Sequence, residues 1–181
     1  SPLKWKKQLR ERLKQHLGYP DPDIVNFNIR SLWKKKVEHG TIEKFVFASE
    51  PFSDVPAYLC IPKHAKPPYK TMICLGGHSK EGMLLSIGGD PDGPHIAVKG
   101  DRDYALQCLK NGFAALCIEQ RGFGERSEPS VNGRQPCYQP VNRALMLGRT
   151  LVGERIFDVK RAIEYLYTRS DIDFSCLGIM G

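Results

Sequence analysis

The chain has 181 residues, of which 41% are hydrophobic and 26% charged, a composition typical of a globular protein that can bury a core in one domain. Its formal charge of +7 is uneven: residues 1–40 hold ten Lys and Arg against four Asp and Glu, and residues 41–181 hold seventeen against sixteen. No basic stripe interleaved with aromatic residues and no zinc-ligand spacing accompanies this charge, so it does not indicate nucleic-acid binding. The basic segment fits a solvated surface, with an anionic partner as the alternative.

The six cysteines form no Cys-x-x-Cys pair, and four of them lie in or beside apolar runs, which is typical of buried thiols in a reduced protein. They are Cys60, Cys74, Cys108, Cys117, Cys137 and Cys176. No stretch approaches the ~18–20 apolar residues of a membrane span, and the basic start lacks the apolar core of a signal peptide. We therefore expect a cytoplasmic protein that does not bind membranes, and secretion after loss of a signal peptide stays open.

The first predicted element is an amphipathic helix over residues 3–17, ended by Gly18 and the prolines that follow. Its apolar positions recur mostly at four-residue steps among Lys, Arg and Gln: Leu3, Trp5, Leu9, Leu13 and Leu17. We expect this stripe to pack on the rest of the chain, and a helix that binds a membrane surface or a partner is the alternative. Residues 1–40 thus form a basic helical leader, and residues 41–181 form the body.

The body begins with two alternating segments, Thr41–Ser49 and Val55–Ile61, whose spacing predicts an antiparallel strand pair. The apolar run that ends Lys70–Leu75 predicts a strand buried on both faces. A helix is expected over Asp101–Asn111, and six consecutive apolar residues, Phe113–Ile118, predict another buried strand.

The last part of the chain repeats this alternation of helix and strand. Glu125–Pro140 is polar and is expected to form a loop. An apolar stripe at steps of three and four predicts a helix over Leu151–Arg169, and Asp171–Gly181 is a polar turn that leads into an apolar strand. The class is therefore α/β: an antiparallel start, then parallel strands with crossover helices.

Three segments in this order resemble the first half of an α/β-hydrolase, and are most similar to the acetyl xylan esterase, cephalosporin-C deacetylase and dienelactone hydrolase group. They are Cys74–His78, Cys117–Ser127 and Gly153–Leu166 leading into Asp171–Gly181. The likeness covers residues 41–181, which would then be the N-terminal part of a hydrolase domain. The family shows D-x-R-G-x-G after its fourth strand, and this chain departs from it at Glu119.

The resemblance implies a catalytic serine in a G-x-S-x-G elbow directly after the fifth strand. Gly181 matches the first glycine of that elbow, so the serine would fall two positions later, and the catalytic acid and histidine would follow it. No catalytic residue of the triad is therefore expected in this chain. The resemblance places one oxyanion-hole donor at the backbone N–H of His78, with Gly77 and Ser79 beside it. A tight turn without this role is the alternative.

Other polar residues have weaker support. Arg121 follows a strand and could bind substrate or tie loops together. His78 as a catalytic base is disfavoured, because its neighbour Ser79 is adjacent in sequence and no orienting acid is marked. The other histidines, His16, His39, His64 and His95, have no metal-ligand spacing, and the aspartates between residues 90 and 103 do not match an EF-hand. We expect no metal and no cofactor.

The resemblance thus implies a serine carboxylesterase or deacetylase acting on small acyl esters of a carbohydrate or similar alcohol. A peptidase of the prolyl-oligopeptidase type and a non-catalytic binding or structural fragment are the alternatives. The expected partners are a small ester substrate and the C-terminal half of the same hydrolase, either a separate chain or further residues. Nucleic acid is not expected, and a homo-oligomer stays open.

Overall fold

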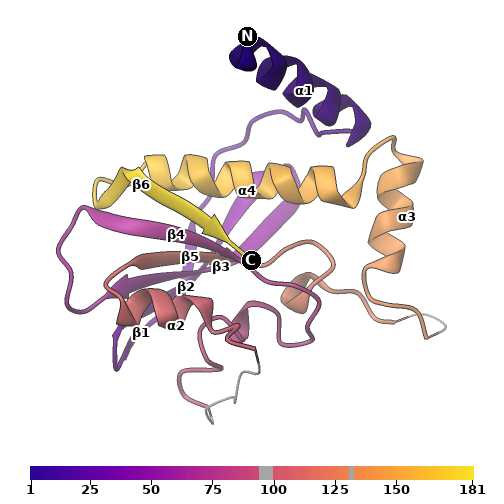
Figure 1. Ribbon diagram of the computed structural model, residues 1–181. Helices are drawn as coiled ribbons and strands as arrows, with labels where there is room; N and C mark the ends of the chain where they lie inside the picture. The colour runs from indigo at the N-terminus through magenta and orange to yellow at the C-terminus, as the bar shows by residue number, and fades with distance from the viewer. Residues whose placement is uncertain (94–99, 131–132) are drawn as a thin grey trace.

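The computed structural model describes residues 1–93, 100–130 and 133–181, which form one six-stranded sheet with helices on both faces (Figure 1). The elements in chain order are α1 (Pro2–His16), β1 (Arg30–Val37), β2 (Gly40–Glu50), β3 (Ser53–Pro62), β4 (Tyr69–Leu75), the 3₁₀ turn η1 (Gly82–Leu84), α2 (Tyr104–Lys110), β5 (Ala114–Ile118), the 3₁₀ turn η2 (Gly124–Arg126), α3 (Tyr138–Met146), α4 (Leu151–Tyr167) and β6 (Ile172–Met180). No helix among the described residues is long and apolar enough to cross a membrane.

The sheet has the strand order β1-β2-β3-β5-β4-β6. The pairings β1–β2, β2–β3 and β3–β5 are antiparallel, and β5, β4 and β6 run parallel to one another. This confirms the predicted α/β class. The strands predicted at 113–118 and in the last segment of the chain are present, and so are the helices predicted at 101–111 and 151–169, with ends that differ by a few residues.

Each face of the sheet has its own core. Side chains such as Phe45, Leu116 and Leu166 pack between the sheet and α4. On the other face, Tyr58 and Leu109 pack with η1 and α2. Because side chains alternate along a strand, β5 serves both cores, and all five of its residues are buried.

The register brings three strand ends to the same edge of the sheet. Leu75 at the end of β4 pairs with Ile118 at the end of β5, and Cys74 pairs with Met180 of β6. β3 runs in the opposite direction, with Ala57 opposite Ile118, so the β2–β3 turn lies at this edge too. In parallel sheets, this carboxyl edge is where binding and catalytic loops lie.

One strand and one α-helix were not predicted, besides the two short 3₁₀ turns. β1 lies within the segment we expected to be a helical leader; it is an edge strand that carries three consecutive lysines, and only alternate residues in its second half are partly buried. α3 begins inside the segment expected to be a loop and buries only Ala144. The predicted histidine His95 lies outside the described residues.

The first helix forms as predicted, but its apolar stripe does not pack on the body as we expected. α1 has no buried residue, and Leu3 and Trp5 are 79% and 61% exposed. Figure 1 shows the helix standing away from the sheet, with only its C-terminal end near the turn between α3 and α4. The spacing of the apolar residues therefore predicted the helix correctly, but our expectation that this stripe packs on the body was wrong.

One residue connects the segment after α1 to the body. Thr150 caps α4: its Oγ1 accepts a hydrogen bond from the Gly153 N–H at 3.0 Å and donates one to the Leu17 carbonyl at 2.6 Å. The Thr150 N–H also donates to the Leu17 carbonyl, at 3.1 Å. One hydroxyl thus starts α4 and anchors the end of α1.

We expect Thr150→Ala to lower the free energy of unfolding by about 1–2 kcal/mol, because it removes the cap and leaves the Gly153 N–H without its acceptor. Thr150→Ser keeps the hydroxyl and serves as the control, with most of the stability retained. Urea unfolding followed by circular dichroism measures both. An alanine variant as stable as the unmodified protein would show that the cap contributes nothing.

Candidate active site

The loop after β4 carries the residues predicted to form half of an oxyanion hole. Gly77 and His78 are exposed, and the side-chain amide of Gln120, which follows β5, donates a hydrogen bond to the Gly76 carbonyl at 2.6 Å. Within the described residues, the backbone N–H groups of Gly77, His78 and Ser79 have no protein acceptor. They are therefore available as donors at the carboxyl edge of the sheet.

The other predicted site residue, Gly181, lies next to this loop. It directly follows β6, whose Met180 pairs with Cys74, and a Cβ on Gly181 would lie 2.7 Å from the Leu75 carbonyl oxygen. The structure thus brings Gly181 to the start of the loop that carries Gly77 and His78. This is the relation that a nucleophile elbow and an oxyanion loop require.

Arg121 lies at the same edge, but its guanidinium is occupied by carboxylates. Its Nε and Nη2 form a two-pronged pair with Asp158 of α4 at 2.9 and 3.0 Å, Nη2 also donates to Glu50, and Nη1 lies 3.2 Å from Glu154. The Arg121 backbone carbonyl accepts hydrogen bonds from the Arg155 guanidinium at 3.0 and 2.7 Å. Of its two predicted roles, this geometry favours tying loops together.

The carboxylate at the centre of this network, Asp158, is only 1% exposed. Arg126 provides a second guanidinium, with Nη1 2.7 Å from Asp158 Oδ2. Burial by itself would raise the pKa of the Asp158 carboxyl, but the hydrogen bonds and charges of Arg121 and Arg126 outweigh it, so this pKa lies below its usual value. Asp158 therefore stays ionised at neutral pH and holds α4 against the loop after β5.

Glu119, the position that departs from the family pattern, connects the loop after β4 to the loop after β5. Its side chain is buried, and Oε2 accepts a hydrogen bond from the Met83 N–H at 3.0 Å, which joins the loop after β5 to η1. Burial raises the pKa of this carboxyl, while the N–H groups of Met83 and Glu125 act in the opposite direction. Gly82 and Gly124, both at positive φ, pack so closely on it that a Cβ on either would overlap the carboxylate.

The His78 side chain does not contact Ser79, whose Oγ donates to Glu81 at 2.6 Å. Instead, His78 Nε2 lies 3.1 Å from Cys137 Sγ, and the imidazole packs on the Phe123 ring with the centroids 4.5 Å apart. This arrangement gives no support to a His78–Ser79 catalytic pair. A pocket of about 350 Å³ opens beside these side chains.

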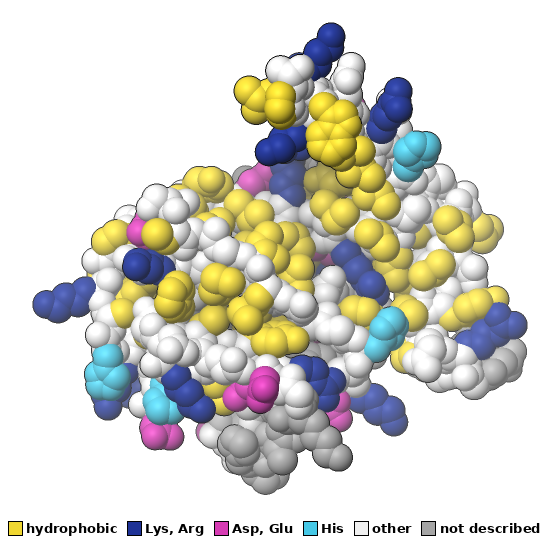
Figure 2. All heavy atoms as spheres, viewed as in Figure 1, with side chains coloured by type: hydrophobic (Ala, Val, Ile, Leu, Met, Phe, Trp, Pro, Cys, Tyr) yellow, Lys and Arg dark blue, Asp and Glu magenta, His cyan; other side chains and the backbone are white. Residues whose placement is uncertain are grey.

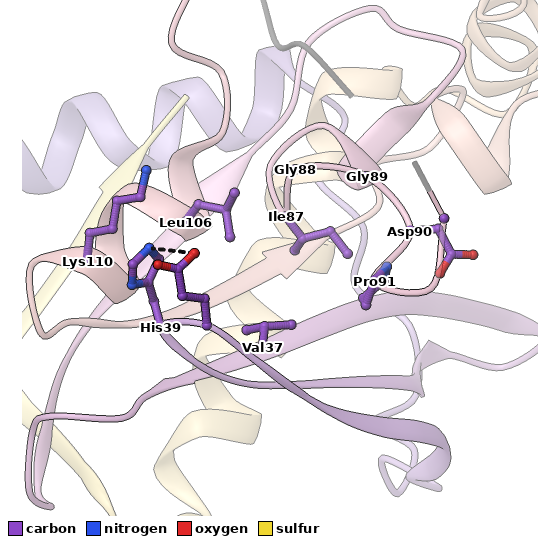
Figure 3. Close-up of a pocket in the computed structure, with 11 residues that line it drawn as sticks. Val37, His39, Ile87, Gly88, Gly89, Asp90, Pro91, Leu106 and Lys110 are labelled. Carbon is purple, nitrogen blue, oxygen red and sulfur yellow. Dashed lines mark ion pairs between the residues drawn. The ribbon is translucent and has the colours of Figure 1, made fainter. Parts of the chain in front are cut away.

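Another pocket, of about 300 Å³, lies between the β1–β2 turn and α2, lined by residues that include His39, Ile87 and Lys110 (Figure 3). It lies at the opposite edge of the sheet from the candidate site. Gly40 at the start of β2 pairs with Pro62 at the end of β3, so the turn before Gly40 lies at the amino edge of the parallel strands. The strand ends that carry the candidate site do not reach this pocket, and we assign it no part in the site.

The sequence did not reveal which partners the polar residues would find. The pairs Arg121–Asp158 and His78–Cys137 join residues 37 and 59 positions apart. The sequence could have indicated a role for Glu119, because the family pattern has an acidic residue at this position. In the part of the chain that the structure describes, no three His, Cys, Asp or Glu side chains are grouped to hold a metal ion.

With this geometry established, comparison with known proteins shows the family. A family model described as "Abhydrolase family" matches residues 2–177. The chain belongs to this family, within the α/β-hydrolase superfamily, which confirms the resemblance found in the sequence.

Individual relatives are distant and longer. The chain is 22% identical over 166 residues to "Putative hydrolase YtaP" of Bacillus subtilis (strain 168), a match that covers 88% of this chain and 50% of that protein. A crystal structure from Bacteroides fragilis NCTC 9343, named as a "putative acetyl xylan esterase", matches with a TM-score of 0.83 and 18% identity over 98% of this chain and 46% of that one. A glucuronoyl esterase from Solibacter usitatus matches with a TM-score of 0.60 and 15% identity over 93% of this chain and 49% of that one.

At these identities, the structural matches show the fold. The chain spans about half the length of the relatives it matches.

We expect Asp158→Asn to lower the free energy of unfolding at pH 7 by about 3–5 kcal/mol, because it takes from Arg126 the carboxylate that it contacts and from Arg121 the most buried of its three carboxylates. The pKa of Asp158 is lower in the folded than in the unfolded protein, so its contribution is present above about pH 4 and is lost as the pH falls through the folded pKa. The difference between the variant and the unmodified protein should therefore narrow in acid.

Urea unfolding at pH 7 and at several values below pH 4 tests this prediction. The control is the same change on β3, Asp54→Asn, because the exposed pair of Asp54 with Arg30 should contribute at most about 1 kcal/mol. A loss for Asp158→Asn no larger than that of the control would contradict the central role of Asp158.

Gly124→Ala tests the close approach to Glu119. We expect it to lower the free energy of unfolding by about 2–4 kcal/mol. The loss combines the backbone strain of an alanine at a φ of +42° with the overlap between its Cβ and the carboxylate. Gly148→Ala is the matched control, because Gly148 has a φ of +69° and a Cβ added there would meet nothing within 4 Å, so only the backbone cost of about 1 kcal/mol applies. Equal thermal unfolding midpoints for the two variants would mean that the approach to Glu119 is not tight.

Proposed function

We propose that this chain is the N-terminal part of a serine ester hydrolase that acts on small acyl esters of a carbohydrate or similar alcohol. The nucleophile would be a serine two positions after Gly181. Its attack on the ester carbonyl would give a tetrahedral intermediate whose oxyanion is held by the backbone N–H of His78, and an acyl-enzyme would follow.

The observation that carries this proposal is the position of Gly181. β6 ends beside β4, so a residue that follows Gly181 would emerge next to the Gly77–Ser79 amides. These amides have no acceptor among the described residues, and they need no side-chain chemistry to act as donors. A nucleophile at this point would have a donor for the developing oxyanion close to the carbon it attacks.

The relatives support an ester substrate. Several structures that share the fold are named as acetyl xylan, glucuronoyl or methyl esterases. Sequence identities of 14–19% to these esterases do not identify the acyl group or the alcohol of the substrate. The proposal of a small acyl ester of a carbohydrate rests on these names and on the motifs after β4 and β5.

We also propose that the C-terminal half of the hydrolase covers β6 and the outer surface of α4. Among the described residues, β6 is an edge strand whose one neighbour is β4. Hydrophobic side chains gather over the face where Figure 1 shows α4 and β6 (Figure 2). Exposed members of this surface are Val152, Ile156, Tyr167 and Ile179. A long edge and apolar groups of this kind are normally covered, and the relatives have chain left to do so.

The test uses the natural protein in its full length. A fluorophosphonate probe should attach to one serine, and peptide mass spectrometry should locate it two residues after Gly181. Hydrolysis of acetylated xylo-oligosaccharides should be lost when that serine is labelled. His78→Ala should keep activity within about tenfold, because it leaves the backbone N–H in place, whereas loss of a catalytic base costs about 10²–10⁴-fold.

Other outcomes separate the alternatives. A labelled serine with cleavage of prolyl peptides and no deacetylation would assign the protein to the peptidases. A protein that takes up no probe and cleaves neither substrate would contradict an enzymatic role and indicate a binding or structural protein.

A further inference from the structure

A cysteine that the proposed hydrolase chemistry does not use lies against the oxyanion loop. Cys137 is half-buried at the start of α3, and its Sγ lies 3.1 Å from His78 Nε2. We infer that Cys137 and His78 form a reactive thiol–imidazole pair, a modification site for low-molecular-weight disulfides. This inference goes beyond the proposed ester hydrolysis and does not depend on it.

The imidazole is placed to take the thiol proton. With its proton on Nδ1, His78 presents the lone pair of Nε2 to the thiol, and the contact distance permits a hydrogen bond between them. The Phe123 ring, 6% exposed and packed against the imidazole, supports the orientation of the imidazole. A thiol next to a base is the arrangement that activates cysteine for nucleophilic attack.

Two further groups favour negative charge on the sulfur as it attacks. Cys137 is the N-cap residue of the nine-residue helix α3, where the helix dipole is positive. Arg155 lies close by: a Cβ built on Gly122 would be 3.2 Å from Cys137 Cβ and 3.5 Å from Arg155 Nη2. The charges of Arg155 and a Cys137 thiolate also attract each other.

These features distinguish Cys137 from the other cysteines. Four of them are buried within the core, and the exposed Cys176 has hydroxyl and carboxylate neighbours, Ser175 and Asp173, with no imidazole contact in the described part of the chain. A cysteine beside a carboxylate gains nothing for attack, because like charges repel. The combination of a nearby imidazole, a helix N-terminus and an arginine is therefore specific to Cys137 among the cysteines.

The pocket of about 350 Å³ beside the pair gives a reagent access. His78, Phe123, Gln135 and Pro136 are among its lining residues. In the proposed step, Cys137 Sγ attacks one sulfur of a disulfide RS–SR while its proton passes to His78 Nε2. The S–S bond breaks, a mixed disulfide forms on Cys137, and the other half leaves as a thiolate that recovers the proton. The protein thiol is oxidised and the released sulfur is reduced.

The experiment measures the rate at which oxidised glutathione modifies Cys137 in the full-length natural protein, by mass spectrometry of the Cys137 peptide at pH 7. We expect His78→Ala to slow this reaction by at least about tenfold. Free imidazole added to this variant should restore much of the rate, a rescue that a merely structural role of His78 would not allow. His64→Ala, which removes an exposed histidine between β3 and β4 that does not line this pocket, should react at the unmodified rate.

The folded state of each variant is checked by circular dichroism. An unchanged rate in folded His78→Ala, or a Cys137 that reacts no faster in the folded than in the denatured protein, would overturn the inference. The readout is the mixed disulfide itself, so its outcome is independent of whether the protein hydrolyses esters.

Discussion

The ion pair between Asp158 and the two arginines Arg121 and Arg126 sets the geometry on which the candidate site depends. A carboxylate that is 1% exposed remains ionised when hydrogen-bond donors replace the water it has lost, and here the donors are two guanidinium groups. The donors come from the loop after β5 and from η2, and the carboxylate comes from the middle of α4. Since α4 leads into β6, this pair also constrains where β6 ends beside β4.

The loops at the carboxyl edge are held by polar contacts as well as by the apolar packing of η1. Glu119 binds the N–H of Met83, Gln120 binds the carbonyl of Gly76, and Arg126 binds the Glu119 carbonyl at 3.1 Å. Each contact joins or supports the loops after β4 and β5, where the ladder of backbone hydrogen bonds between the strands has ended. Directional contacts suit this place, because they fix the backbone while leaving amide groups free to meet a substrate.

The strands and helices of the body could be predicted because their signals are local. The apolar run that ends at Ile118 and the stripe along α4 are periodic over a few residues. β1 could not be predicted in this way, because Lys34–Lys36 hide a half-buried strand whose partner lies on β2. The family pattern predicted part of the site, namely Gly77, His78 and Gly181. It did not predict Asp158, Glu50 and Cys137, which reach the site only through the fold.

The two faces of the sheet differ in how completely other elements cover them. On the α2 face, a continuous cluster of side chains is buried between the sheet, η1 and α2. On the α4 face, the inner side of the helix is buried but its outer side exposes Val152 and Ile156, and β6 is an edge strand of the sheet that the described residues form. Apolar area left in water gives up the free energy that burial would provide, about 25 cal/mol per Å². The uncovered face therefore marks the side on which further polypeptide would stabilise this fold, and α1, whose apolar side chains also find no partner in the body, projects toward solvent beside it (Figure 1).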